Sequence, residues 1–150
     1  MPRYFLDSSA LVKRYHLESG TADVEALFNV VENRFLISRL ALVEVQSTLA
    51  RLVREKAITR QDLDSASAFL EHDVASGLLN VVAVSSPRLD AAATLIVTHG
   101  ITHSMRTLDA IHLATAQTLD GRSRLTGFIA ADKKLLDAAR ACGLPTIAIS

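Results

Sequence analysis

The sequence lacks several features on which extracellular and membrane proteins depend. Cys142 is the only cysteine among 150 residues, so no intramolecular disulfide can form, and no set of Cys and His ligands indicates structural zinc. We expect this thiol, at the end of a helical pattern, to serve only in packing. No apolar run approaches the roughly 18 residues of a membrane-spanning helix, and Met1-Pro2-Arg3 leads into a strand-like segment without a signal-peptide pattern. These absences favour a cytoplasmic protein without a membrane partner.

An excess of charge of either sign is also missing. Sixteen basic and sixteen acidic residues cancel to a formal net charge of zero, so no global field draws the chain onto nucleic acid, and any nucleic-acid site must be local. With 49% hydrophobic and 21% charged residues, the chain has enough apolar surface to fold. Its length and composition predict one domain over residues 1–150.

Short β-rich runs alternate with longer helical patterns, which predicts an α/β fold. Because the runs are apolar on both faces, we expect a mostly parallel sheet with helices on both sides. Two consecutive helical patterns between Arg39 and Gly77 predict a projecting helical hairpin. Thr59-Arg60-Gln61-Asp62 resembles a capping box, and Gly77, Gly100 and Gly143 lie where helices should end. The predicted strands are Tyr4-Phe5-Leu6, Phe35-Leu36-Ile37, Val81-Val82-Ala83-Val84, Phe128-Ile129-Ala130 and Thr146-Ile147-Ala148-Ile149.

Two aspartates directly follow predicted strands. Asp7 ends the first run and Asp132 follows the fourth. In open α/β sheets, ligands bind outside the carboxyl ends of the strands, so a parallel sheet would bring both carboxylates to one edge. Either residue alone is equally explained as a helix cap, since each precedes a helical pattern.

Two further acids lie inside helical patterns. Glu44 has apolar neighbours in Leu42-Val43-Glu44-Val45 and lies past the first turn, so capping does not explain it; an unpaired carboxylate there requires a cation or a hydrogen-bond partner. A salt bridge or a partly exposed position remains the alternative. Asp109 lies in a first turn that Thr107 can cap, where an anion suits the helix dipole. The apolar turns that follow it predict a buried helix.

If these four acids converge, a cation must relieve their repulsion. Oxygen ligands select hard metals, and Mg²⁺ or Mn²⁺ fits a partial carboxylate cage that leaves positions open for water and substrate phosphate. The other acids examined lie in polar or mixed helical patterns and are interpreted as solvated: Asp23, Glu25, Asp62, Asp64, Glu71, Asp73, Asp90 and Asp137.

Four segments together resemble the successive signatures of PIN-domain ribonucleases, in particular the VapC-like toxins of prokaryotic toxin–antitoxin pairs. They are Phe5-Leu6-Asp7-Ser8-Ser9-Ala10-Leu11, Ser38-Arg39-Leu40-Ala41-Leu42-Val43-Glu44-Val45, Thr107-Leu108-Asp109-Ala110-Ile111-His112-Leu113-Ala114 and Ala131-Asp132-Lys133-Lys134-Leu135. The resemblance spans nearly the whole chain. It implies a PIN-like three-layer α/β/α sandwich.

The same resemblance implies a function. In such proteins an acidic quartet, here Asp7, Glu44, Asp109 and Asp132, binds Mg²⁺ or Mn²⁺ as the cofactor for endonucleolytic hydrolysis of RNA phosphodiester bonds. It also implies a cytoplasmic homodimer inhibited by a small antitoxin that inserts a segment near the active site. Many relatives carry Thr or Ser where this chain has Ala130, which weakens the support expected around Asp132.

Other polar residues have supporting roles in this hypothesis. Ser9 is a candidate to support the acids through its hydroxyl, although it is equally explained as a small residue of a first turn. Arg106 is a candidate contact to RNA phosphate. His112, one turn after Asp109, suggests a general base, but its apolar flanks favour a hydrogen-bonded packing histidine. A looser basic rim consists of Lys13, Arg14, Lys133 and Lys134.

Rival functions are weaker or remain open. A haloacid-dehalogenase-like phosphatase would carry a second aspartate at the position of Ser9, and no glycine-rich phosphate loop or dinucleotide fingerprint occurs. The remaining alternative is a PIN scaffold with little or no catalytic activity that binds RNA or a protein partner.

Overall fold

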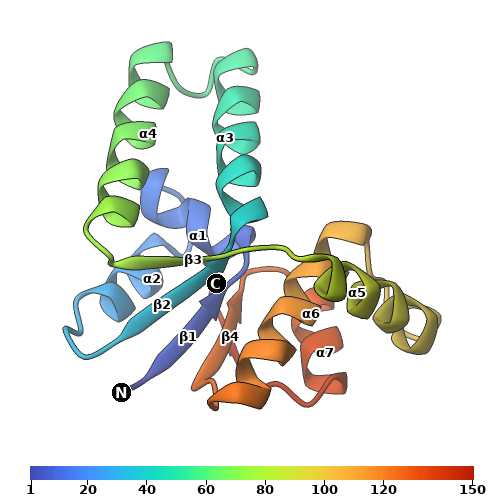
Figure 1. Ribbon diagram of the computed structural model, residues 1–150. Helices are drawn as coiled ribbons and strands as arrows, with labels where there is room; N and C mark the ends of the chain where they lie inside the picture. The colour runs from blue at the N-terminus through green and yellow to red at the C-terminus, as the bar shows by residue number, and fades with distance from the viewer.

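A five-stranded parallel sheet forms the middle layer of the computed structural model, which describes residues 1–150 (Figure 1). The strand order is β3-β2-β1-β4-β5, and every neighbouring pair is parallel. The central strand β1 therefore ends between the carboxyl ends of β2 and β4. The strands are β1 (Arg3–Leu6), β2 (Arg34–Ser38), β3 (Leu79–Val82), β4 (Gly127–Ala130) and β5 (Thr146–Ala148).

Helices cover both faces of this sheet. On one side lie α1 (Ser8–Tyr15), α2 (Thr21–Phe28), α3 (Arg39–Arg54) and α4 (Arg60–Ala75), and on the other lie α5 (Ser86–His99), α6 (Thr107–Arg122) and α7 (Lys133–Ala141). Each side has its own cluster of 17 buried residues. Successive strand residues point to opposite faces, so Phe5 joins the cluster of α5–α7 while Leu6 joins the other. The expected three-layer α/β/α architecture is confirmed.

The third strand differs from its prediction by two residues. It spans Leu79–Val82, so it begins and ends two residues before the predicted Val81–Val84. As an edge strand, β3 pairs only with β2, from Phe35↔Leu79 to Ser38↔Val82. Since α3 begins directly after Ser38, no partner exists beyond Val82, and tertiary pairing overrides the local apolar pattern.

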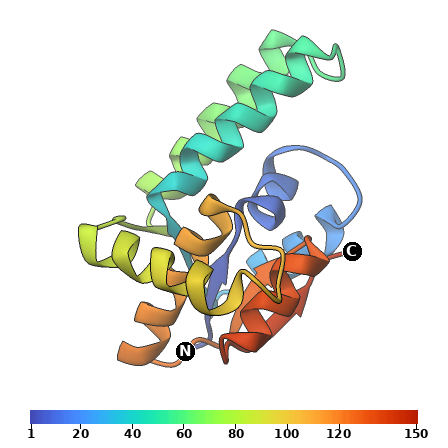
Figure 2. The ribbon, with the colours of Figure 1, turned by 90° about the vertical axis from the view of Figure 1, so that its right-hand side faces the viewer.

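The predicted helical hairpin is confirmed as α3 and α4, which project from the sheet (Figures 1 and 2). Thr59 and Asp62 form the expected capping box at the start of α4, with each side chain accepting a hydrogen bond from the other's backbone N–H. Gly77, two residues after this helix, has the positive φ of +79° that favours glycine.

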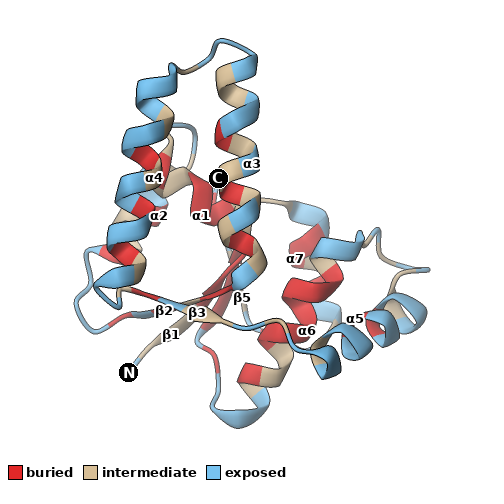
Figure 3. Ribbon diagram, turned by 45° about the horizontal axis from the view of Figure 1, so that its top comes forward, coloured by how far each residue is buried: buried red, intermediate tan, exposed pale blue.

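Helix α6 is the most deeply buried helix of the fold, as its apolar sequence indicates. Seven consecutive residues from Ala110 to Ala116 are buried, which Figure 3 shows as a nearly continuous red segment. A helix can be buried all round only when neighbours cover it, and here α5 and α7 share its hydrophobic cluster. Cys142, directly after α7, packs against the same cluster as expected. None of the helices is both long and apolar enough to cross a bilayer.

A buried ion pair attaches α4 to α1, and here two expectations are wrong. Asp73 is only 2% exposed and accepts hydrogen bonds from Arg14 Nε and from Tyr15 Oη, both at 2.7 Å. The Arg14 guanidinium also stacks on Phe28 and Phe69, 4.3 and 4.7 Å from their ring centroids. Asp73 is therefore not a solvated acid, and Arg14 does not belong to an exposed basic rim, because the two charges pair between helices.

Replacing Asp73 tests this attachment. In Asp73→Ala, the Arg14 guanidinium and the Tyr15 hydroxyl lose their buried acceptor, and breaking a buried pair in this way costs about 3 kcal/mol of unfolding free energy. Urea denaturation followed by circular dichroism measures the loss.

Asp64→Ala is the matched control on the same helix. Asp64 pairs with Arg60 at 3.0 Å, but both side chains are exposed, so the change should stay below about 0.5 kcal/mol. Equal losses in the two variants would contradict the special role of the buried pair.

Candidate active site at the carboxyl edge of the sheet

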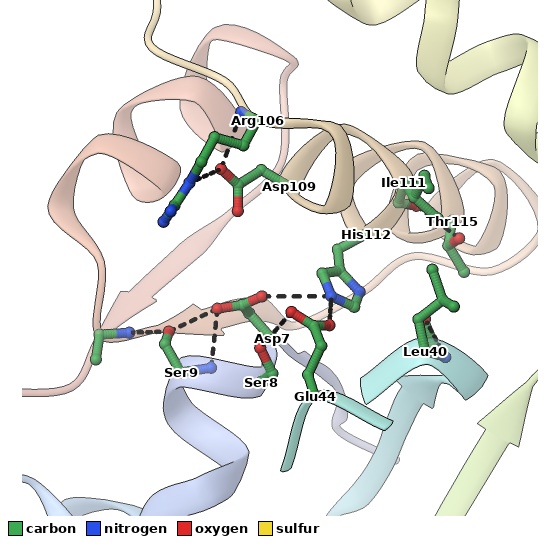
Figure 4. A network of polar contacts seen from close by, with 12 residues as sticks. Asp7, Ser8, Ser9, Leu40, Glu44, Arg106, Asp109, Ile111, His112 and Thr115 are labelled. Carbon is green, nitrogen blue, oxygen red and sulfur yellow. Dashed lines mark hydrogen bonds and ion pairs between the residues drawn. The ribbon is translucent and has the colours of Figure 1, made fainter. Parts of the chain in front are cut away.

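Asp7 follows β1 and serves as the N-cap of α1. Its Oδ2 accepts hydrogen bonds from the Ser9 backbone N–H at 3.0 Å and from Ser9 Oγ at 2.6 Å. The same hydroxyl accepts a hydrogen bond from the Ala131 N–H at 3.1 Å, which ties Asp7 to the end of β4. Ser9 thus holds one oxygen of Asp7, while the other faces away from the cap (Figure 4).

Glu44 lies in the second turn of α3 and takes no part in capping. Ser8 Oγ donates to its Oε2 at 3.0 Å, and His112 Nε2 is hydrogen-bonded to its Oε1. The Glu44 side chain is 22% exposed. The partner that the sequence requires for this carboxylate is therefore supplied by α1 and α6 together.

His112 joins two of the acids. The residue is fully buried, and its Nε2 also lies 3.7 Å from Asp7 Oδ1. It is buried and hydrogen-bonded, as its apolar flanks predict, but its contacts to Asp7 and Glu44 were not anticipated. The sequence indicated these contacts only through the position of His112 one turn after Asp109, which places both side chains on one face of α6.

Asp109 lies in the first turn of α6. Its Oδ2 accepts a hydrogen bond from the Arg106 N–H at 3.1 Å, so Arg106, not the expected Thr107, is the N-cap residue. Figure 4 shows its other oxygen directed toward the side where Asp7 and Glu44 lie. Asp109 and Glu44 line the same cleft, which has a volume of about 610 Å³.

The basic residues near this cleft differ in availability. Arg106 also lines it, and its side chain is 85% exposed, with Nε 3.8 Å from Asp109 Oδ2. Lys13 instead donates to Glu18 and to the Ser19 carbonyl, and Lys133 pairs with Asp137. Arg106 is therefore the cation best placed to meet an anionic ligand in the cleft.

Asp132 stands apart from the other three acids. It caps α7, with Oδ1 accepting from the Lys134 N–H at 2.9 Å and the Leu135 N–H at 3.4 Å. No hydrogen bond or ion pair connects it to Asp7, Glu44 or Asp109. Three of the four candidate acids share contacts or a cleft, whereas Asp132 shares only the edge of the sheet.

Burial and the neighbouring charges set the pKa values of Asp7 and His112. Burial raises the pKa of the Asp7 carboxyl above its ordinary value of 3.8, although His112 and the Ser9 hydrogen bonds act in the opposite direction. Burial acts to lower the pKa of His112, but the hydrogen bond to Glu44 and the charges of Asp7, Glu44 and Asp109 outweigh it, so that pKa is raised. A cation beside Asp7 would favour its ionised form.

The donor chemistry of the cluster fits a hard divalent cation. Asp7, Glu44 and Asp109 offer only carboxylate oxygens, the ligands that Mg²⁺ and Mn²⁺ prefer. No three His, Cys, Asp or Glu side chains form a ready-made ligand cluster. The acids are hydrogen-bonded to His112, to serine hydroxyls and to backbone N–H groups. The residue types needed for a metal are thus present at one edge, held by protein partners.

A second cavity is larger than this cleft but contains no cluster of carboxylates. It has a volume of about 700 Å³ and is lined by Arg14 and Asp73 among others. These two charges pair with each other, so they are not available to act on a ligand. The candidate site is therefore the cleft at the sheet edge.

Comparisons with known proteins indicate one family. A family model for the PIN domain matches residues 4–141, a span that contains all four candidate acids. Ribonuclease VapC35 from Mycobacterium tuberculosis is 30% identical over 145 residues, which cover 96% of this chain and 95% of that protein.

Solved structures show the same fold. The crystal structure of VapC20 from Mycobacterium tuberculosis, described as a Sarcin-Ricin loop cleaving toxin, matches with a TM-score of 0.67 at 17% identity over 94% of this chain and 95% of that chain. VapBC2 from Rickettsia felis, solved bound to a DNA fragment from their promoter, gives a TM-score of 0.66 at 15% identity and 99% coverage of both chains. At these identities the likeness concerns the fold.

The raised pKa of Asp7 predicts that Asp7→Asn stabilises the metal-free protein at pH 7. Because the folded pKa lies above the unfolded value of 3.8, the ionised carboxylate lowers stability above the folded pKa and has no such effect below pH 3.8. Thermal unfolding in EDTA should therefore give Asp7→Asn the higher Tm at pH 7, with the difference vanishing toward pH 3.

Asp62→Asn is a control of opposite sign. Hydrogen bonding to the Thr59 N–H lowers the pKa of this exposed acid, so its contribution to stability is present at pH 7 and is lost as the pH falls. A lower Tm is expected for Asp62→Asn. A lower Tm for Asp7→Asn as well would contradict the effect of burial.

Proposed function

Since this chain belongs to the PIN-domain family, we propose that it is a metal-dependent endoribonuclease that hydrolyses RNA phosphodiester bonds. The observation that carries the proposal is the meeting of Asp7 and Glu44 at His112, beside the cleft that Glu44 shares with Asp109. The similarity to ribonuclease VapC35 over nearly the whole length of that protein supports the activity. The family match over residues 4–141 supports one PIN domain, and its action on RNA in the cytoplasm is part of the same proposal.

Asp7, Glu44 and Asp109 are the residues proposed to hold the cation. Bound Mg²⁺ or Mn²⁺ would lower the pKa of a water and stabilise charge on the leaving oxygen. Asp7 and Asp109 each have one oxygen in a cap and one without a hydrogen-bonded partner, so each can bind a ligand without releasing its helix. Asp132 has the same division at α7, and we propose for it a subordinate role through water or a second metal.

The remaining residues of the site orient these acids and bind substrate. Ser9 fixes the Asp7 carboxylate through its hydroxyl and anchors it to β4 through Ala131. Arg106 lies at the rim of the cleft with its guanidinium in solvent, where it can neutralise an RNA phosphate and fix the strand's position. Sequence readout requires contacts to the bases in addition.

Protein partners are also proposed. Exposed apolar side chains lie directly beside two of the acids, Val43 at 66% exposure and Leu108 at 42%, and such surfaces often mark protein contacts. The solved VapBC2 assembly and the VapC-type relatives support a toxin that a small antitoxin inhibits near this cleft. A homodimer is the further partner that the family resemblance implies.

Cleavage of RNA is the decisive test. Asp7→Asn and Asp109→Asn should each lower the Mg²⁺-dependent cleavage rate at least about 100-fold, because each removes a charged ligand from the ion that activates the water. Gel analysis of a defined RNA, alongside circular dichroism of each variant, separates lost chemistry from lost folding.

Two further variants sharpen this test. Asp90→Asn changes an exposed acid of α5 and should leave the rate unchanged. Asp132→Asn keeps a good helix cap and should lose less activity than Asp7→Asn. Metal-bound wild-type protein that binds RNA without cutting it would instead favour the non-cleaving binding module.

Metal binding gives a second test that needs no substrate. A ligand that binds only the native state stabilises it, by about 2.7 kcal/mol at 100 times its dissociation constant. Mn²⁺ in millimolar excess should therefore raise the Tm of the wild-type protein but not that of Asp109→Asn. The absence of a shift in wild-type protein would contradict a metal site.

A further inference from the structure

Glu44 differs from the other acids in the way it is held. Asp7, Asp109 and Asp132 are each fixed by backbone N–H groups at a helix start, whereas both oxygens of Glu44 are bound by side chains. Ser8 Oγ donates to Oε2 at 3.0 Å, and His112 Nε2 contacts Oε1. The two partners come from different helices, α1 and α6, and neither is explained by the need to cap a helix.

The contacts of His112 indicate that this residue serves to hold the Glu44 carboxylate. The imidazole is fully buried, and its Nδ1 has no hydrogen-bond partner. Its only polar contacts are therefore those of Nε2 with Glu44 and Asp7. Burying a polar ring with one nitrogen unpaired is unfavourable, so packing alone gives no reason for a histidine at this position.

The bond between His112 and Glu44 also joins the two layers of helices. It is the one side chain–side chain hydrogen bond in the structure that connects helices on opposite faces of the sheet, α3 and α6 (Figure 4). Ser8 contributes from the start of α1, next to Asp7. A flexible glutamate is thereby fixed from both sides at the place where the layers meet.

We propose that Ser8 and His112 are positioning residues that clamp the carboxylate of Glu44 for metal binding. This inference rests on the proposed function, because the metal is the one described there. Groups that hydrogen-bond to metal ligands orient those ligands, and their removal commonly weakens metal affinity. The clamped Glu44 side chain still lines the cleft. Because its rotamer is already fixed, less conformational freedom is lost when the carboxylate binds a metal ion.

Isothermal titration of the full-length protein with Mn²⁺ measures the effect without substrate. Ser8→Ala should weaken Mn²⁺ binding about tenfold, and Ser8→Thr, which retains the hydroxyl, should restore most of it. Because Ser8 acts through Glu44, Ser8→Ala should change affinity by less than about twofold in a Glu44→Gln background. His112→Gln should also weaken binding, with His72→Gln, an exposed histidine of α4, as its control.

Ser86→Ala is the matched control for Ser8, since Ser86 is likewise the first residue of its helix but is exposed and lies outside the site. Chemical unfolding in EDTA provides a readout without metal: Ser8 and Glu44 should show a non-additive double-mutant cycle. Additive unfolding energies would overturn the clamp. If Ser8 and Glu44 are coupled in unfolding but Ser8→Ala binds Mn²⁺ as tightly as the wild-type protein, Ser8 has only a structural role and its positioning role is overturned.

The two proposals fail in distinguishable ways. If wild-type protein binds no Mn²⁺ and cuts no RNA, the proposed function fails, and positioning for a metal fails with it, even where the cycle in EDTA shows coupling. If wild-type protein binds Mn²⁺ and Ser8→Ala binds it equally well, only the clamp fails.

Discussion

Helices that begin at the carboxyl edge of a sheet need acceptors for their first backbone N–H groups, and this need organises the candidate site. Asp7 and Asp132 follow strands directly and cap α1 and α7, while Asp109 reaches back to the Arg106 N–H at the start of α6. Each carboxylate uses one oxygen for its helix and has a second for a ligand. Capping and metal binding are therefore compatible roles for the same side chain, because a carboxylate has two oxygens.

Glu44 shows what happens when no cap is available. Its carboxylate lies in the second turn of α3, where the backbone offers no free N–H donor. Ser8 and His112, from neighbouring helices, form the hydrogen bonds to this carboxylate instead. The arrangement concentrates charge at a partly buried place, and the raised pKa of Asp7 reflects the unfavourable burial. A fold that keeps such a group gives up stability for chemistry, which is the pattern of functional sites generally.

Much of this structure follows from local sequence, and the exceptions share a cause. Most strand segments, the α3–α4 hairpin and the Thr59–Asp62 capping box depend on local patterns, and they were predictable. The partner of Asp73 lies 59 residues away at Arg14, and β3 takes its limits from β2. The bonds of Glu44 to Ser8 and His112 span 36 and 68 residues. No local pattern indicates such pairings, because only the assembled fold brings these residues together.

Two ionic contacts between helices also help to explain why the layers of the protein have one arrangement. Hydrophobic contacts are non-directional, so the two clusters of 17 residues do not by themselves fix how helices on opposite faces align. Directional hydrogen bonds act at two points, one within a layer of helices and one between the two layers. Arg14 and Asp73 set the hairpin against α1, and His112 and Glu44 set α6 against α3. The second contact lies among the candidate ligands, so alignment of the layers and geometry of the site depend on the same bond.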